Sequence, residues 1–237
     1  MTMRRSFSLF SALFLFVLLL PARAQLRGNG VIKSENRSIR EVRAVKVNKG
    51  IDLYIRQGDN EKLTLEADEN LLKYFVSDVS NGTLTLTIDK TFVQAKTLKA
   101  YLTVRSLERL ESSGGSDVYS EGVLRAEKMI CQASGGSDVR LELDVKNMTI
   151  NTSGGADAYL KGLASQLQVS ASGGSDIKAR DLRADVVKAT ASGGADVHVF
   201  ADLRLTARAS GAGSVYYYGD PQEVNQSSSG GGDVKKR

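Results

Sequence analysis

The chain has 237 residues, among them 23 glycines, two prolines and no tryptophan, and its formal net charge is +5. Three arginines lie in the first 24 residues, which contain no acidic side chain, so residues 25–237 carry 32 − 3 = 29 basic and 27 acidic side chains, a net charge of +2. Such a balanced charge gives no support for a nucleic-acid partner. One cysteine alone, Cys131, excludes an intramolecular disulfide framework.

Residues 1–24 have the pattern of a cleaved secretory signal peptide. Arg4 and Arg5 precede an apolar run over residues 9–20, and residues 21–24 end in the small-x-small pattern that signal peptidases recognise. The run is too short to span a bilayer. We therefore expect an exported protein that is not integral to the membrane after cleavage and resides in the periplasm, on the outer-membrane surface or in the medium. The alternative is an uncleaved anchor.

Two further segments precede the most regular part of the chain. Residues 25–36 are polar and contain glycine, which predicts a flexible lead. Residues 37–110 alternate apolar and polar side chains with a period of two, as half-buried strands do. Within this N-terminal β region, residues 69–77 are the one place where a helical turn is expected.

Residues 111–234 contain a recurring phrase, Ser-Gly-Gly-(Ser or Ala)-Asp. Copies begin at Ser113, Ser134, Ser153, Ser172 and Ser192, and degenerate copies follow at residues 210 and 229. Successive copies start 21, 19, 19, 20, 18 and 19 residues apart. A period near twenty residues indicates a solenoid.

Each repeat contains two short stretches of alternating apolar and polar residues. At about 3.3 Å per residue, twenty residues make one closed coil, and coils stack about 4.8 Å apart. We predict an all-β protein with a right-handed parallel β-helix of about 20-residue coils, continuous with N-terminal strands that cap the first coil. The C-terminal coil would be left open for a partner or for a second copy, giving a homo-oligomer. A β-sandwich built from hairpins is the competing fold.

The repeated phrase is expected to form a tight corner in each coil, because glycine permits positive φ. The predicted structural turns comprise Gly114, Gly115, Asp117, Gly135, Gly136, Asp138, Gly154, Gly155, Asp157, Gly173, Gly174, Asp176, Gly193, Gly194 and Asp196. Stacked coils would bring the aspartates of adjacent coils to roughly 5 Å from each other. Either each carboxylate accepts amide hydrogen bonds in its own corner, or Asp117, Asp138, Asp157, Asp176 and Asp196 hold a row of calcium ions.

Two residues after each aspartate, and after Ser214 in the degenerate copy, lies an outward position that is aromatic or cationic. We call this row the outer ladder; it consists of Tyr119, Arg140, Tyr159, Lys178, His198 and Tyr216. Flat aromatic faces beside cations suit sugar rings or the surface of a partner protein. The alternative is a solvated face held together by cation–π contacts between coils.

The sequence offers little for catalysis, and no cofactor is expected. His198 is the single histidine, Cys131 falls in an inward row, and there is neither a G-x-S-x-G elbow nor a phosphate-binding loop. We predict a binding protein that is not an enzyme. A purely structural or oligomerisation module is the main alternative, and a polysaccharide-active enzyme is the third.

The export signal, the segment Val45-Lys46-Val47-Asn48-Lys49-Gly50-Ile51-Asp52-Leu53-Tyr54-Ile55 and the repeats together resemble the family called putative auto-transporter adhesin, head GIN domain. The resemblance covers roughly residues 38–233. It implies an all-β protein with a parallel β-helix portion, located on the cell envelope or secreted. An adhesin of this kind would bind glycans or proteins of the envelope or of a host surface.

Overall fold

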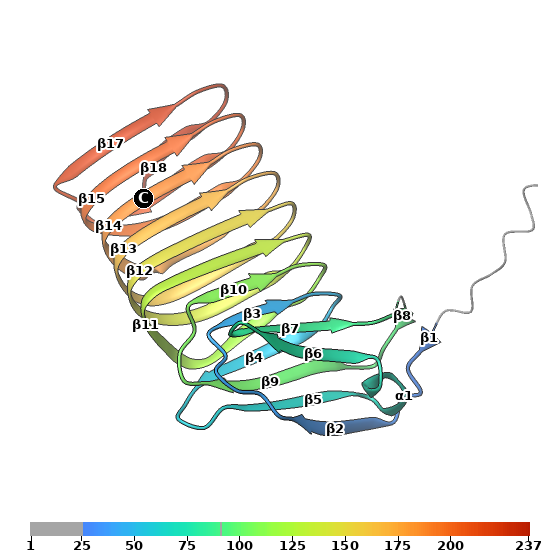
Figure 1. Cartoon of the computed structure of the whole chain (residues 1–237). Coiled ribbons are helices and arrows are strands. Elements are labelled where there is room, and N and C mark those ends of the chain that lie inside the picture. Colours follow the sequence, from blue (N-terminus) through green and yellow to red (C-terminus); the bar gives the residue numbers. More distant parts are fainter. Residues whose placement is uncertain (1–25, 91) are drawn as a thin grey trace, which may run out of the picture.

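The computed structural model describes residues 26–90 and 92–237, so the predicted signal peptide lies outside the described residues. The fold is almost entirely β, with a β-solenoid of about seven turns spaced about 19 residues apart. The solenoid rises from the N-terminal strands and ends at the C-terminus (Figure 1). Among the described residues, no helix is long and apolar enough to cross a membrane.

The elements follow two groups along the chain. The first group consists of β1 (Leu26–Arg27), β2 (Ile32–Arg37), β3 (Ala44–Val47), β4 (Asp52–Gln57), β5 (Lys62–Asp68), α1 (Glu69–Leu72), β6 (Phe75–Ser80), β7 (Thr83–Ile88), β8 (Phe92–Gln94), β9 (Leu98–Val104) and β10 (Arg109–Ser112). The second consists of β11 (Val118–Ser134), β12 (Asp138–Ser153), β13 (Asp157–Ala171), β14 (Ile177–Ala191), β15 (Asp196–Ala209), β16 (Ser214–Tyr218), β17 (Glu223–Ser228) and β18 (Asp233–Lys236). The short helix α1 lies where the helical turn was expected.

The repeats stack with equivalent positions opposite one another. Val118 pairs with Val139, Val139 with Ala158, and Ala158 with Ile177, all in parallel register. These residues are buried, with 0% of their surface exposed. The prediction of a parallel β-solenoid is therefore confirmed. Apolar and polar residues alternate in each repeat because every second side chain of each coil points into one shared core.

The fourth position of the repeated phrase also points inward. Ser116, Ser137 and Ser175, like the alanines at the equivalent places, are 0% exposed. The buried hydroxyls have partners: Ser137 Oγ donates to the Ser112 carbonyl at 3.2 Å, and Ser175 Oγ lies 3.0 Å from Thr152 Oγ1. In these copies of the phrase, the side chain that enters the core at the corner is small, either serine or alanine.

The N-terminal strands continue the walls of the solenoid. β10 joins β11 to β3, and β4 lies between β11 and β9, all in parallel. A coil therefore already exists over residues 44–57, before the repeats predicted to start at residue 111. Its corner stacks on the first repeated corner, since the Gly50 amide donates to the Gly114 carbonyl at 3.1 Å. Antiparallel pairing of β5 with β9 and of β6 with β7 then closes this end.

The expectation of a flexible lead is wrong for the end of residues 25–36. Residues 32–37 form β2, which pairs antiparallel with β5 over its whole length. Just before β2, the buried carboxylate of Asp68 accepts the Gly30 amide at 2.7 Å. These hydrogen bonds hold the segment although its side chains are mostly exposed.

The C-terminal end of the solenoid is open. β17 pairs with β15 and β18 pairs with β16, and within the described residues no strand follows them in the stack. Val224 and Gln226, which occupy inward rows, are exposed on β17. The core thus ends in polar and accessible positions, as their residue types suggest.

Candidate functional site

The repeated corners lie directly over one another. The first glycine of each corner has φ between 62° and 76°; these are Gly114, Gly135, Gly154, Gly173 and Gly193. The second glycine has positive φ only at Gly115 and Gly136, and not at Gly155, Gly174 or Gly194. Amides of one corner donate to carbonyls of the neighbouring corner, for example the Gly194 amide to the Gly173 carbonyl at 2.7 Å. The corners therefore form a continuous hydrogen-bonded edge.

The aspartates that follow the corners connect neighbouring coils. The Asp138 amide donates to Asp117 Oδ1 at 3.1 Å, and the Asp176 amide donates to Asp157 Oδ1 at 3.0 Å. The Asp196 amide does the same with Asp176 at 3.3 Å. For Asp117, Asp157 and Asp176, a hydrogen bond from the amide of the next coil thus takes the place of the expected bonding within the same corner.

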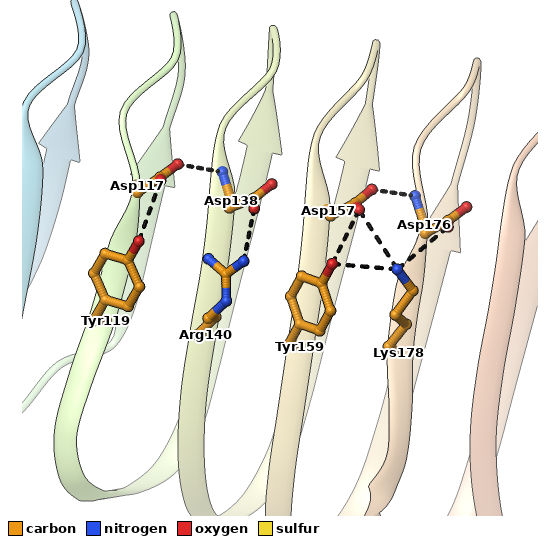
Figure 2. A network of polar contacts seen from close by, with 8 residues as sticks. All are labelled: Asp117, Tyr119, Asp138, Arg140, Asp157, Tyr159, Asp176 and Lys178. Carbon is orange, nitrogen blue, oxygen red and sulfur yellow. Dashed lines mark hydrogen bonds and ion pairs between the residues drawn. The ribbon is translucent and has the colours of Figure 1, made fainter.

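The outer ladder supplies side-chain partners for four of the five carboxylates, those of Asp117, Asp138, Asp157 and Asp176 (Figure 2). Tyr119 donates its hydroxyl to Asp117 at 3.2 Å, and Arg140 pairs with Asp138 at 2.9 Å. Lys178 lies 3.6 Å from Asp157 and 3.6 Å from Asp176. Repulsion between stacked carboxylates is offset by side chains two residues further along each strand.

The aspartates beside the outer ladder favour the charged form of its cations. Burial lowers the pKa of Lys178, but the Tyr159 hydroxyl and the carboxylates of Asp157 and Asp176 outweigh it and raise the pKa overall. In the described part of the chain, no group of three or more His, Cys, Asp or Glu side chains could hold a metal ion. Of the five carboxylates predicted as calcium ligands, those of Asp117, Asp138, Asp157 and Asp176 have protein partners.

The rungs of the outer ladder stack face to face along the solenoid. The Arg140 guanidinium lies 4.6 Å from the centre of the Tyr159 ring, and Lys178 Nζ lies 4.7 Å from it on the next coil. His198 and Tyr216 stack with 4.7 Å between ring centres. Because neighbouring rungs cover the ring faces, the expectation of flat faces open to sugars is wrong. Ring edges, hydroxyls and cationic groups are what remain accessible.

Two rungs were missed in the sequence. Tyr54 on β4 stacks on Tyr119 and on Tyr101 of β9, with 5.1 Å between ring centres in both pairs. The triplet Asp52-Leu53-Tyr54 has the same pattern as Asp117-Val118-Tyr119 and could have identified the first. Tyr101 carries no such signal, because its place follows only from the pairing of β9 with β4.

A groove of about 560 Å³ runs over the outer ladder. Its floor contains five of the predicted rungs, from Tyr119 to His198, together with Tyr218. Since these residues come from successive strands β11 to β16, the groove crosses the strands and follows the solenoid axis. Along its lip, Lys161 pairs with Glu142 at 3.0 Å. Tyr216, Tyr54 and Tyr101 do not line it.

Neither Cys131 nor His198 lies where it could serve in nucleophilic or metal chemistry. Cys131 is 0% exposed, and burial raises the pKa of its thiol to about 12. His198 is held in the ladder, and burial lowers its pKa although Asp196 and Asp176 act in the opposite direction.

We expect the Cys131 thiol of the folded protein to be unreactive. A thiolate is the reacting species, and at pH 8 a thiol with a pKa of about 12 is almost wholly protonated as well as shielded. Iodoacetamide followed by mass spectrometry should label the protein only after denaturation. Rapid labelling of the native chain would show that the core opens at this coil.

The fold and the site define a capped parallel β-solenoid that carries a polar ladder and a groove on one face. The family model described as putative auto-transporter adhesin, head GIN domain, matches residues 42–221, and the chain belongs to this family. The family is of adhesin type, which suggests a cell-surface or exported protein. No curated protein matches the chain.

Several solved bacterial structures share this fold. A putative adhesin from Bacteroides fragilis has a TM-score of 0.85 and 24% identity over 90% of this chain and 100% of that chain. A putative adhesin from Parabacteroides merdae has a TM-score of 0.72 and 20% identity, covering 90% and 99%. A structure described as a putative lipid binding protein, from Parabacteroides distasonis, has a TM-score of 0.74 and 20% identity with the same coverage.

Proposed function

We propose that this protein is an exported, non-catalytic adhesin that binds a carbohydrate chain in the groove over the outer ladder. The export rests on the predicted signal peptide, and the adhesin role rests on the family. The observation that carries the ligand class is the groove itself, whose floor is made by one polar rung from each successive coil.

The spacing of the rungs suits a polymer. Coils repeat about every 4.8 Å, so hydroxyl, guanidinium and ammonium groups recur at a regular interval along the groove. A polysaccharide presents hydroxyl groups at regular intervals as well, and such groups accept and donate hydrogen bonds to ring edges and cations. The ladder is preorganised by stacking and by its aspartate partners, which lowers the entropic cost of binding.

The groove does not favour hydrolysis of the chain that it would hold. Its two lip carboxylates, Glu142 and Asp181, stand on either side of Lys161 in the register of the strands. Glu142 is paired with Lys161 at 3.0 Å, and Asp181 with Arg180 at 3.5 Å. Glycoside hydrolysis uses two carboxyl groups that flank the bond, one acting on the leaving group and one on water or the sugar. Here each of the two carboxylates is instead paired with a cation of the protein.

Binding to the groove is tested with single ladder substitutions. Tyr159→Phe removes a hydroxyl from the groove floor and keeps the ring between Arg140 and Lys178. Loss of one hydrogen bond should weaken binding of a soluble polysaccharide about threefold to tenfold, measured by isothermal titration calorimetry. Tyr54→Phe makes the same chemical change on a rung outside the groove and is the matched control.

The combined substitution Tyr159→Ala with Lys178→Ala should abolish polysaccharide binding while circular dichroism shows the fold retained. A glycan array screened with the wild-type protein identifies the probe for these measurements. Unchanged binding by the double variant, or no binding anywhere on the array, would reject the groove as a carbohydrate site. Shortened products after incubation with polysaccharide would favour the enzyme instead.

A further inference from the structure

A second face of the solenoid is centred on one exposed leucine. Leu163 on β13 is 56% exposed, the highest value for any large apolar side chain among the described residues. It borders a hollow of about 770 Å³ whose floor includes Val145 and Ala164. Single exposed leucines are common, so the significance of Leu163 depends on what surrounds it.

Charged residues flank Leu163 symmetrically along the solenoid axis. In register with it, Arg125 and Asp144 lie two coils and one coil before, and Arg183 lies one coil after. On the coil after that, Phe200 is in register with Arg183, and Asp202, two residues beyond Phe200, pairs with Arg183 at 2.8 Å. Arg125 pairs with Asp144 at 3.4 Å. The order along the axis is therefore positive, negative, apolar, positive, negative.

In a second copy that runs in the opposite direction, this order of charges presents a negative group opposite each positive group. A two-fold axis perpendicular to the face at Leu163 would place Asp144 opposite the partner's Arg183, and the coil that carries Arg125 opposite the partner's coil that carries Asp202. The two leucines would meet at the axis. Parallel alignment of two copies would instead set each charge against its like, which costs free energy. We infer that a second copy of this chain docks here, with the two solenoids antiparallel.

The chemistry of the face supports an association of this kind. A two-fold interface uses the same patch on both subunits, so self-complementary charge is its expected signature. Arg125 already pairs with Asp144, and Arg183 with Asp202, so docking leaves none of these four charges without a partner. Two ion pairs brought together in opposite order make a network of four alternating charges, which is more favourable than isolated exposed pairs.

The inference is tested by cross-linking through an introduced cysteine. Leu163→Cys puts a thiol on the proposed axis, and the one native thiol, Cys131, is buried and contributes no background. In the dimer the two thiols are held close, so mild oxidation should give disulfide-linked dimer at least about tenfold faster than for unassociated chains. Non-reducing gels and sedimentation velocity measure it.

Two control variants distinguish this face from others. Leu203→Cys places a thiol at another exposed leucine away from the axis, with 49% of its surface accessible. Asn225→Cys places one on the open β17 edge, where end-to-end assembly would bring two copies together. The inference is supported if Leu163→Cys forms more cross-linked dimer than the two controls and if the yield of that dimer falls in 1 M NaCl. Equal cross-linking of Leu203→Cys, or preferred cross-linking of Asn225→Cys, overturns it.

Discussion

Replacing Gly162 with alanine is expected to destabilise the solenoid by more than about 3 kcal/mol. Gly162 has φ of +114°, a region that alanine adopts only under strain, and an added Cβ would lie 2.0 Å from the Leu143 carbonyl oxygen. That oxygen belongs to the backbone of the neighbouring coil. It cannot move away without breaking the pairing of β12 with β13, so strain and collision add together. Urea denaturation followed by circular dichroism measures the loss.

Gly122 provides the matched control for this substitution. It lies in the outer turn of another coil with φ of +94°, and an added Cβ would have no heavy atom within 4 Å. Gly122→Ala should therefore cost only the conformational strain, about 1 to 2 kcal/mol. Equal losses of stability in the two variants would mean that the close approach of the two coils adds nothing to the cost of Gly162→Ala.

Replacing Asp68 with alanine is expected to cost about 3 kcal/mol or more, because three amides lose their acceptor. Asp68 is 0% exposed, and its carboxylate accepts the amides of Gly30 at 2.7 Å, Lys96 at 2.8 Å and Thr97 at 3.3 Å. These bonds join the segment before β2 to the loop before β9. Hydrogen exchange should show both segments losing protection, whereas loss confined to one of them would contradict a shared clamp.

The same carboxylate makes part of the stability depend on acid. Burial alone raises the pKa of Asp68, but the amide hydrogen bonds outweigh it and lower the pKa below the ordinary value of 3.8. Its contribution is therefore complete above pH 3.8 and is lost as the pH falls through the lowered folded-state pKa. Asp68→Asn, which has no proton to gain, should show a smaller decrease in stability over that range.

Most of the solenoid could be predicted because each coil buries the same positions. The spacing of the glycine corners fixed the stacking, and the residue after each aspartate identified the inward row. The coil over residues 44–57 escaped because its corner lacks the phrase: Lys49 takes positive φ of 61°, and Ile51 occupies the buried fourth position. The lead was misjudged because β2 is held by backbone bonds, which leave little trace in side-chain types.

The candidate site was predictable in its positions but not in its contacts. Alternation identified the rungs from Tyr119 to Tyr216 as outward. It did not give the side-chain orientations that turn ring faces toward neighbouring rungs, nor the register detail that directs Asp117 to the Asp138 amide. The side-chain orientations and the register depend on the packing of one coil against the next, which one repeat alone does not determine. The self-complementary charges around Leu163 became visible only once the coils were aligned in register.

Each coil adds one corner, one carboxylate and one rung, and it depends only on the coil on either side. Duplicating or deleting one repeat would therefore lengthen or shorten the wall by a single step of about 4.8 Å and leave its chemistry unchanged. The length of the solenoid can thus change during evolution by whole repeats, without any change of fold.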